Sequence, residues 1–363
     1  MEQAHSFGLA KDFLCVTYKN SIQKRGFVSI MKAMVLEHDA DVMTNPLHLR
    51  IIEEPEPGPG QVRIKVQVCG VCRTDLHVVE GELPGMTRPI IPGHQAVGIV
   101  DRIGANVYSL KEGERVGMAW LQRTCKACEF CQSGRENLCP EATFSGYHVH
   151  GGFAEYTVMP EEFAYPIPAI FSDEEAAPLL CAGIIGYRAL RRSQVKPGQR
   201  LGLFGFGASA HITIQIARHW GCSVYVFSHR EEHRELGRTL GAEWAGHSTD
   251  TPPDPLHSAI IFAPVGELVP LALRAVGWGG TVAVAGIHMS AIPAMDYDRD
   301  LFHERTLQSV TANTKQDGLD LLRQAAAIPI RTHTQAFGLE EANVALQRLK
   351  AGNIVGAAVL KIG

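Results

Sequence analysis

Hydrophobic residues follow two different rhythms along this chain. Between residues 31 and 158, short apolar runs alternate with glycine and proline, as in VRIKVQVCGVC, PGHQAVGIVDRIG and GGFAEYTVM. Such runs are typical of strands, so this part predicts an all-β, barrel-like unit. After Pro178 helix and strand patterns alternate, in LLCAGIIGYRAL, RLGLFGFGASAHITIQIARHWG, SVYVFS, AIIFAPV and GGTVAVAGI. That order predicts an α/β unit with a parallel, doubly wound sheet.

The C-terminal tail changes pattern again. IPIRTHTQAF predicts a strand, LEEANVALQRLKAG an amphipathic helix that ends at Gly352, and AAVLKI a final strand. We expect this tail to rejoin the first unit, because 363 residues exceed the usual size of one hydrophobic core. The predicted division is one domain from 31–181 together with 317–363, and a second domain from 182–316.

The first thirty residues stand apart from both units. MEQAHSFGLAKDFLCVTYKNSIQKRGFVSI carries basic residues but also Glu2 and Asp12, and it lacks the continuous apolar core of a secretory signal. We expect residues 1–30 to be a leader or a disordered arm before the strand-like MKAMVLE at Met31. A mitochondrial presequence is the less favoured alternative.

Composition and charge narrow the class of protein. Apolar residues make up 45% and charged residues 20%, which is the profile of a globular enzyme. The formal net charge is −4, with no basic stripe for a phosphate backbone and no apolar run of membrane-spanning length, so we expect no nucleic-acid or membrane partner. Nine cysteines, an odd number with four crowded together, favour metal binding in a reducing, cytoplasmic compartment over a disulfide framework.

A glycine-rich turn follows the strand LGLF. Gly205, Gly207 and Ala210 form G-x-G-x-x-A between a predicted strand and a predicted helix. The first glycine permits a tight turn, Gly207 and Ala208 let the backbone approach a pyrophosphate, and Ala210 allows close helix packing. An ordinary strand-to-helix turn is the alternative, but the placement favours a nicotinamide dinucleotide site.

The end of the next strand, SVYVF, indicates which dinucleotide binds. Ser228 and Arg230 stand where NAD-binding sheets usually carry a carboxylate for the ribose hydroxyls, and Glu231 follows only later. Serine and arginine side chains can donate hydrogen bonds to the 2′-phosphate of NADP(H), whereas the free 2′-hydroxyl of NAD(H) usually binds a carboxylate. The sequence therefore favours NADP(H) over NAD(H). Alternatively, Arg230 is a solvated residue at a helix start.

Four cysteines lie within one short segment. Cys125, Cys128, Cys131 and Cys139 follow the spacing C-x2-C-x2-C-x7-C. Four thiolates select tetrahedral zinc, and with no open coordination position such a site is structural. The alternatives are four unrelated buried cysteines and an iron–sulfur cluster. The iron–sulfur cluster is the stronger alternative of the two, although the predicted hydride transfer does not require one.

A second metal site requires residues from distant segments. Cys72, His94 and Cys181 together offer two thiolates and one imidazole, which leave a fourth position open, as in catalytic zinc sites. Taken singly, each cysteine is more often a small core residue and the histidine a turn residue.

The chain from Met31 onward resembles the zinc-dependent medium-chain alcohol dehydrogenase family. The resemblance rests on the four-cysteine segment, on G-H-x-x-x-G around His94 and on C-x-T-D-x-H from Cys72. CRTDLH, CAGIIGYRAL and GFGASAH are most similar to its bacterial, cinnamyl and propanol-preferring branch. The resemblance implies a GroES-like β-barrel catalytic domain, a Rossmann cofactor domain and a homodimer or homotetramer. It also implies two zinc ions per chain and reversible hydride transfer between a primary aliphatic, allylic or aromatic alcohol, its aldehyde, and NAD(P).

The same resemblance assigns roles to residues near the predicted sites. Thr74 would take the hydroxyl proton and pass it through the nicotinamide ribose to His77, while Asp75 would hold the far nitrogen of His94. A turn hydroxyl and a surface histidine are the alternatives for Thr74 and His77. Further cofactor contacts are implied at Arg73, Ile185, Ala285 and Ile287. An apolar substrate slot is implied at Trp120 and Leu121, with Val79 and Met289 equally explained by core packing.

Two positions differ from the residues that are usual in the family's motifs. Gln95 replaces a usual Glu beside His94, and Ile185 replaces a usual Thr at the nicotinamide. We expect Gln95 to prevent a carboxylate from exchanging onto the metal, and Ile185 to pack on the nicotinamide face. These departures keep two rivals open: a non-catalytic NADP(H)-binding sensor of the same fold, and a zinc polyol dehydrogenase. The latter commonly has a carboxylate where Cys181 stands.

Overall fold

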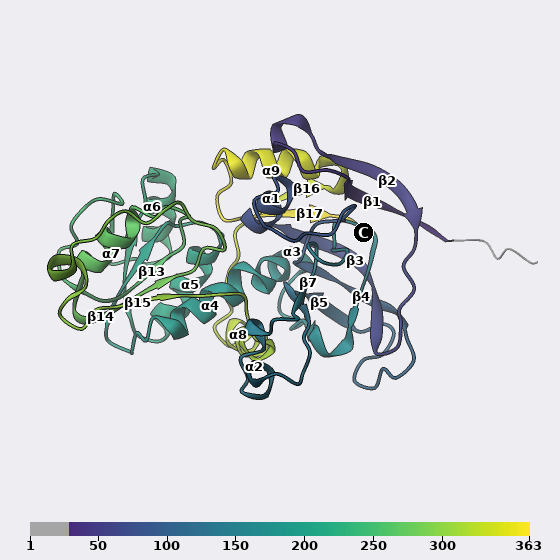
Figure 1. Cartoon of the computed structure of the whole chain (residues 1–363), viewed down its shortest axis with the longest axis horizontal. Helices are drawn as coiled ribbons and strands as arrows, with labels where there is room; N and C mark the ends of the chain where they lie inside the picture. Colours follow the sequence, from purple (N-terminus) through teal and green to yellow (C-terminus); the bar gives the residue numbers. More distant parts are fainter. Residues whose placement is uncertain (1–28) are drawn as a thin grey trace, which may run out of the picture.

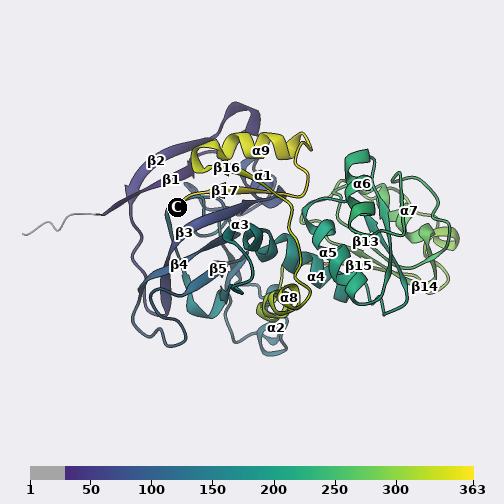
Figure 2. The ribbon, with the colours of Figure 1, turned by 180° about the vertical axis from the view of Figure 1, so that it is seen from behind.

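Two β-sheets organise the chain into two lobes (Figure 1). The computed structural model describes residues 29–363, so only Ser29 and Ile30 of the predicted leader fall inside it. One lobe holds a seven-stranded sheet and the other a six-stranded sheet, with α4 (Ala182–Arg192), α5 (Ala208–His219) and α8 (Lys315–Ala327) between them (Figures 1 and 2). Both predicted classes of sheet are therefore present.

The seven-stranded sheet is mostly antiparallel. Its order is β16-β17-β3-β4-β5-β9, and β8 pairs with the first half of β3. β3 is buried along most of its length because it pairs with β4, β8 and β17. Its apolar residues alternate with Arg63, Lys65 and Gln67 in the first half and run together from Val68 to Val71. The bounds are β3 (Gln61–Val71), β4 (Ala96–Ile103), β5 (Arg115–Met118), β8 (Tyr156–Pro160), β9 (Ala164–Pro166), β16 (Thr334–Gly338) and β17 (Ala357–Lys361).

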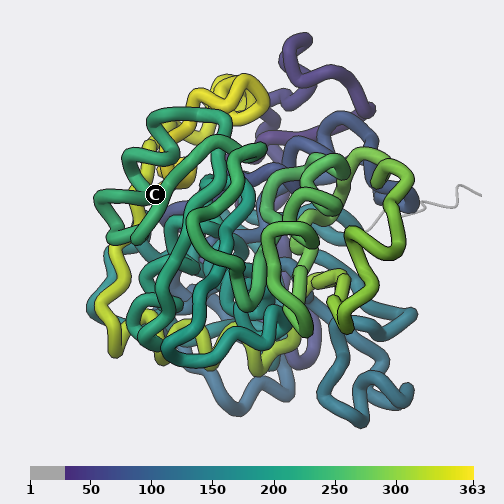
Figure 3. The backbone as a smooth tube through the Cα atoms, turned by 90° about the vertical axis from the view of Figure 1, so that its left-hand side faces the viewer, coloured from purple at the N-terminus to yellow at the C-terminus, as the bar shows by residue number. Residues whose placement is uncertain are grey.

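The six-stranded sheet is parallel throughout, in the order β12-β11-β10-β13-β14-β15. The chain winds one way from β10 and then returns to its other side at β13. A ligand crevice is expected at the carboxyl end of β10, where this reversal occurs. Figure 3 views the molecule from the side of this lobe. Its strands are β10 (Arg200–Phe204), β11 (Ser223–Phe227), β12 (Trp244–Gly246), β13 (Leu256–Ile261), β14 (Val276–Val284) and β15 (Thr306–Ser309).

Short elements complete the chain. Two small antiparallel ribbons pair β1 (Ile30–Leu36) with β2 (Leu47–Glu53) and β6 (Leu121–Arg123) with β7 (Thr143–Phe144). The other helices are α1 (Arg73–Val79), α2 (Glu129–Gln132), α3 (Asp173–Ala176), α6 (Glu231–Thr239), α7 (Leu268–Ala275) and α9 (Ala342–Lys350). The 3₁₀ turns are η1 (Val42–Thr44), η2 (Glu136–Leu138), η3 (Glu161–Phe163), η4 (Ala177–Leu180) and η6 (Leu339–Glu341), and η5 (Tyr297–Leu301) is a π-helical turn.

The tail rejoins the first lobe, as the sequence predicts. β17 pairs antiparallel with β3, with Val359 opposite Gly70, and the yellow tail lies beside the purple and blue strands in Figures 1 and 2. The predicted strand IPIRTHTQAF is shorter than expected, because β16 begins only at Thr334. The backbone N–H groups of Arg331 and His333 donate instead to side chains of α5, so this segment spans the lobes before it becomes a strand.

One apolar core cluster joins the two lobes. It packs Val68, Val97 and Tyr165 from the first sheet with Leu203 and Leu321 from the second sheet and α8. The proposed domain boundaries lie at the first residue of α4 and within the first turn of α8. Within residues 29–363, no helix is long and apolar enough to cross a membrane.

Candidate active site

Cys72 caps the helix that follows β3. Its backbone is extended, its Sγ accepts the N–H of Thr74 at 3.4 Å, and its own N–H donates to Asp75 Oδ2 at 2.8 Å. This reciprocal capping box explains why C-R-T-D starts α1. The cap fixes Cys72 where a strand ends and a helix begins.

Cys72, His94 and Cys181 meet, as the sequence predicts, although they come from three separate segments. Cys72 Sγ lies 3.4 Å from His94 Nε2 and 3.9 Å from Cys181 Sγ, and the three possible ligand atoms all lie within 4.8 Å of one another. His94 comes from the loop before β4, and Cys181 lies between η4 and α4. Two sulfurs and one ring nitrogen fit tetrahedral zinc with one position left for a substrate oxygen.

Asp75 supports His94 from behind. Its Oδ1 lies 3.0 Å from His94 Nδ1 and also accepts the N–H of Gly93 at 3.2 Å, and both side chains are 1% exposed. A proton on Nδ1 leaves the Nε2 lone pair toward the sulfurs, which is the tautomer a metal ligand needs. Burial alone would lower the pKa of His94, but Asp75 and Cys72 outweigh burial and raise it.

The four predicted structural ligands also meet. The sulfur atoms of Cys125, Cys128, Cys131 and Cys139 lie within 4.8 Å of one another, with separations of 3.5 Å from Cys139 to Cys125 and 3.6 Å from Cys128 to Cys131. Backbone N–H groups of Ala127 and Cys128 lower the pKa of Cys125 to about 7, which favours the thiolate at Cys125, whereas burial raises the pKa of Cys131 to about 11. Four ligands close the coordination sphere.

This four-cysteine segment docks on the junction of the two lobes. Asn137 Nδ2 donates to the carbonyl of Thr311 at 2.8 Å, and the N–H of Lys315 donates to Glu136 Oε1 at 2.7 Å. Thr311 follows β15 and Lys315 opens α8. The segment therefore packs against the connection between β15 and α8.

A cavity of about 840 Å³ lies between the two sheets, with the Cys72–His94–Cys181 cluster in its wall. Most residues predicted for the cofactor, for proton transfer or for the substrate line it: Arg73, Thr74, His77, Trp120, Ile185, Gly205, Gly207, Ala208, Ser228, Ala285 and Ile287. Seven predicted or considered residues do not line it: Asp75, Val79, Gln95, Leu121, Ala210, Arg230 and Met289. On the substrate side, the lining therefore lacks the residues considered at Val79, Leu121 and Met289 and includes others instead.

Leu121 illustrates why a neighbour of a lining residue can lie outside the cavity. Trp120 lies in the wall, whereas Leu121 begins β6 and is fully buried in the core of the first lobe. Successive residues of extended chain point in opposite directions, so both side chains cannot face the same space. Phe144, which pairs with Leu121 across the ribbon, lines the cavity instead.

Phe144 and Tyr147 form an aromatic wall with Trp120 that the sequence did not reveal. The Trp120 ring stacks on Phe144 with centroids 5.0 Å apart, lies 5.6 Å from Tyr147, and meets His94 edge-on at 5.0 Å. The Tyr147 hydroxyl donates to the carbonyl of Pro84, which fixes its ring. Apolar residues in a loop resemble core residues in a sequence, so only the fold distinguishes them.

The glycine-rich turn opens into the same cavity. Gly205 has φ +86°, and a Cβ there would lie 2.8 Å from the backbone nitrogen of Ala263, so this position requires glycine. Gly207 caps α5, and a Cβ on it would meet nothing within 4 Å, which leaves room for a ligand above the helix N-terminus. Ala210 is fully buried, in keeping with a packing role.

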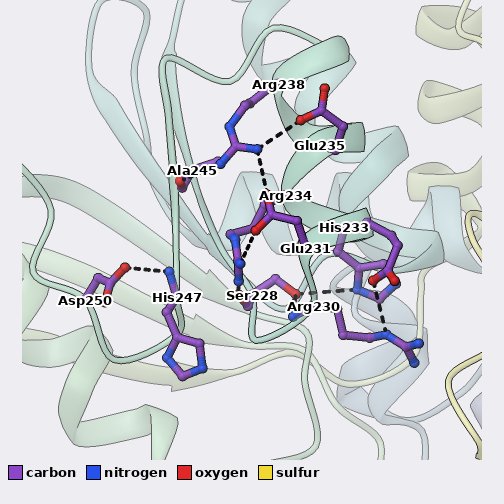
Figure 4. A network of polar contacts seen from close by, with 11 residues as sticks. Ser228, Arg230, Glu231, His233, Arg234, Glu235, Arg238, Ala245, His247 and Asp250 are labelled. Atoms are coloured by element: carbon purple, nitrogen blue, oxygen red, sulfur yellow. Dashed lines mark hydrogen bonds and ion pairs between the residues drawn. The ribbon is translucent and has the colours of Figure 1, made fainter.

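The structure gives the two residues predicted for a 2′-phosphate different places (Figure 4). Ser228 is in the cavity lining and its Oγ accepts the N–H of Arg230 at 3.3 Å. The Arg230 guanidinium instead donates to the carbonyl oxygens of Gly352 and Ala351 from the returning tail. His229 and His233, which the sequence analysis did not single out, line the cavity beside Ser228.

Gln95 lies behind the metal-ligand cluster and outside the cavity lining. It is 2% exposed, and its Nε2 has no hydrogen-bond partner among residues 29–363. A Cβ on Gly70 would lie 2.8 Å from Gln95 Oε1, so the amide packs on the backbone of β3. The predicted effect of Gln95 on metal exchange remains a prediction.

Comparison with known proteins gives the same picture at the level of sequence and fold. The alcohol dehydrogenase GroES-like domain matches residues 58–169, and the zinc-binding dehydrogenase domain matches residues 210–327. The "Probable alcohol dehydrogenase AdhA" of Mycobacterium tuberculosis (strain CDC 1551 / Oshkosh) is 46% identical over 337 residues, covering 92% of this chain and 97% of that protein.

Two solved structures are similar over nearly the whole chain. The cinnamyl alcohol dehydrogenase of Sorghum bicolor has a TM-score of 0.83 at 25% identity, covering 92% of this chain and 98% of its own. The "putative zinc-binding dehydrogenase" of Sinorhizobium meliloti 1021 bound to NADP has a TM-score of 0.79 at 27% identity, covering 92% of this chain and 99% of its own.

Proposed function

Because the chain belongs to the zinc-dependent medium-chain alcohol dehydrogenase family, we propose that its two-lobed cavity is the site of reversible hydride transfer between a primary alcohol and a nicotinamide cofactor. The observation that carries this proposal is one cavity lined both by Cys72, His94 and Cys181 and by the glycine-rich turn at Gly205 and Gly207. A metal-ligand set with an open position and a dinucleotide-binding turn in one wall are the two parts that alcohol oxidation needs.

The residues of the chain supply binding, orientation and proton transfer. Zn²⁺ held by Cys72, His94 and Cys181 would supply the Lewis acidity that lowers the pKa of an alcohol hydroxyl, and the nicotinamide would accept the hydride. Asp75 keeps His94 in its ligand tautomer. Thr74 and His77 both line the cavity. The Thr74 hydroxyl would accept the proton of the substrate hydroxyl, and His77 would receive it through the nicotinamide ribose.

Steady-state oxidation of benzyl alcohol in the presence of zinc tests this function. We expect reduced cofactor to accumulate with wild-type protein and not with Cys72→Ser. No turnover by folded, zinc-loaded wild-type protein with any of several primary alcohols would favour the non-catalytic sensor instead.

We propose two zinc ions per chain, one in each cysteine-containing cluster. The support is that residues 29–363 hold two groups of possible ligands whose donor atoms lie within 4.8 Å, one with three members and one with four. Metal analysis after gel filtration should give about two zinc ions per chain for the wild type and about one for Cys131→Ser.

We propose NADP(H) as the preferred cofactor. Ser228, His229 and His233 line the cavity, and His233 Nδ1 lies 3.5 Å from Ser228 Oγ. The Glu231 carboxylate instead pairs with Arg234 and Arg238 (Figure 4). A 2′-phosphate would therefore meet donors rather than a free carboxylate. Initial rates with NADP and NAD in parallel test this, and a tenfold preference for NAD would overturn it.

We propose that a flat, unsaturated alcohol suits this cavity better than an alkyl alcohol. Trp120, Phe144 and Tyr147 line the cavity as one aromatic group, and the Trp120 ring lies edge-on to His94. An aromatic contact adds about 1 kcal/mol to apolar burial. Cinnamyl or benzyl alcohol should therefore have a higher kcat/KM than cyclohexylmethanol, which has a saturated ring of similar size. Equal values for benzyl alcohol and cyclohexylmethanol would contradict this.

We also propose a homodimer or homotetramer in the cytoplasm. β15 is the open edge of a parallel sheet, and Trp278, Tyr297 and Phe302 nearby are at least half exposed, with 77%, 63% and 51% of their surfaces accessible. The eight cysteines within residues 29–363 form no disulfide with one another, which suits a reducing compartment. Light scattering and cell fractionation test these two statements.

A further inference from the structure

His77 does not face the cavity alone. Its Nδ1 is bonded to the carboxylate of Glu82, which follows five residues later in the turn after α1, and the N–H of Glu82 donates to the carbonyl of His77 at 3.0 Å. The His288 ring lies 5.2 Å from the His77 ring, centroid to centroid. His288 belongs to the loop after β14, so it comes from the other lobe.

His77, Glu82 and His288 differ in their exposure to solvent. The His77 side chain is 8% exposed and the Glu82 side chain 40% exposed, and His288 is an exposed residue that also lines the cavity. A proton on His77 therefore has little direct access to bulk water. Glu82 and His288 both lie against His77 and are both more exposed than it is.

The charges around the group keep Glu82 ionised. The pKa of Glu82 lies below its usual range because His77 donates a hydrogen bond to it, and the charges of His288 and Lys350 act in the same direction. Lys350 of α9 is itself paired with Glu80 at 2.6 Å and Asp41 at 3.0 Å. An ionised carboxylate can only accept, so His77 donates from Nδ1 and presents Nε2 as its free acceptor.

We propose that Glu82 and His288 form the outer half of a proton outlet, in which Glu82 positions His77 as a base and His288 carries its proton to solvent. The inference rests on the proposed function, because it requires a proton to be released during alcohol oxidation. His77 gains one proton at Nε2 from the cavity side and becomes an imidazolium held at Nδ1 by the Glu82 carboxylate. The ring then gives one proton to His288 and so to buffer, which restores the neutral form of His77 with its proton on Nδ1. Only N–H and O–H bonds form and break, so one proton leaves for each hydride transferred.

The experiment measures proton release separately from reduced cofactor. Zinc-loaded enzyme, cofactor and benzyl alcohol are mixed in weak buffer containing a pH-indicator dye, and both signals are followed by stopped flow. In the wild type the two signals should rise together. In the double variant Glu82→Gln/His288→Asn, proton release should lag by about tenfold.

Chemical rescue distinguishes an outlet from a structural role. Added imidazole should restore proton release in the double variant and leave the wild type unchanged, because a small base can replace the missing relay. Glu82→Asp, which retains the carboxylate, should retain most of the wild-type rate. His303→Asn is the matched control, since His303 stacks on Trp278 away from the cavity and a histidine is lost there as well.

Two results would overturn the proposal: proton release that keeps pace with reduced cofactor in the double variant, or a lag that imidazole does not shorten. Failure of the proposed function is recognised separately, because the wild type would then form no reduced cofactor. Nitrogen-15 NMR of His77 needs no turnover. We expect its proton on Nδ1 in the wild type and shared between both nitrogens in Glu82→Gln, and a wild-type proton on Nε2 would also refute the proposal.

Discussion

The two cysteine clusters have similar ligands but opposite construction. Cys125, Cys128, Cys131 and Cys139 lie within one short segment and close on one another, whereas Cys72, His94 and Cys181 come from three segments that only the folded sheet brings together. Backbone N–H groups support the first cluster locally, and a buried carboxylate, Asp75, supports the second. A contiguous cluster is thus set by spacing, and an assembled cluster is set by the fold.

Because of this difference, we expect one cluster to affect folding stability and the other to affect turnover. The contiguous cluster offers four possible ligands, which would leave no position for a substrate, so we expect it to hold residues 125–139 against Thr311 and Lys315. The assembled cluster offers three possible ligands and faces the cavity. Losing a ligand should therefore cost turnover in one cluster and folding stability in the other.

The largest effect should come from the assembled cluster. Cys181→Ala removes one of three ligands, so we expect kcat to fall by at least about a thousandfold while the melting temperature changes little. Metal content should drop from about two to about one zinc ion per chain. Residual turnover near that of the wild type would place the reacting oxygen elsewhere.

The contiguous cluster should respond in the opposite way. Cys128→Ser opens a closed site that has no role in catalysis, so we expect a loss of about 3 kcal/mol in the free energy of unfolding. Turnover per folded molecule should remain within a few-fold of wild type at low temperature. Urea titration and activity of the gel-filtered protein measure the two quantities, and a thousandfold loss of kcat with unchanged stability would reverse the assignment.

A smaller effect should follow from the support of His94. Asp75→Asn keeps the shape of the side chain but removes its charge, so zinc affinity at the assembled cluster should fall by about 10- to 100-fold. Chelator competition should show one weakened zinc ion and one unchanged, because Asp75 lies far from residues 125–139 along the chain and contacts Gly93 and His94 instead. Equal weakening of both ions would mean that the mutation acts on the whole fold.

The sequence predicted features that depend on short spacing. The glycine-rich turn, the four cysteines and the C-x-T-D-x-H run each lie within one element or turn, and the structure brings their members together. The change of hydrophobic rhythm after Pro178 predicted the two kinds of sheet for the same reason. The prediction that Cys72 and Cys181 belong to one metal site required the family resemblance, because nothing in their spacing links them.

The features that the sequence missed depend on contacts across the fold. Arg230 was expected at a phosphate, but carbonyl oxygens of Ala351 and Gly352, in the returning tail, lie within its reach. Phe144 and Tyr147 look like core residues until the ribbon turns them toward Trp120. His288 reaches His77 only because the two lobes meet. No local pattern contains such information.

The smallest predicted effect concerns the frame that holds the assembled cluster together. His211 of α5 is fully buried and accepts the N–H of His333 in the segment that returns to β16, and burial lowers its pKa to about 4 from the ordinary 6.5. Above pH 6.5 both folded and unfolded chains carry it neutral. As the pH falls from 6.5 toward 4 only the unfolded chain gains the proton, so the free energy of unfolding falls, by roughly 1 kcal/mol at pH 5.5.

His211→Gln should flatten this pH dependence in urea titrations, because the glutamine side chain still accepts the N–H of His333 but does not titrate. His303→Asn should leave the pH dependence unchanged. If His211→Gln and wild-type protein lose stability in parallel over this range, the acid sensitivity lies elsewhere. If only the wild type does, the fold that assembles Cys72, His94 and Cys181 depends on a neutral histidine between the lobes, a dependence that the contiguous cluster does not share.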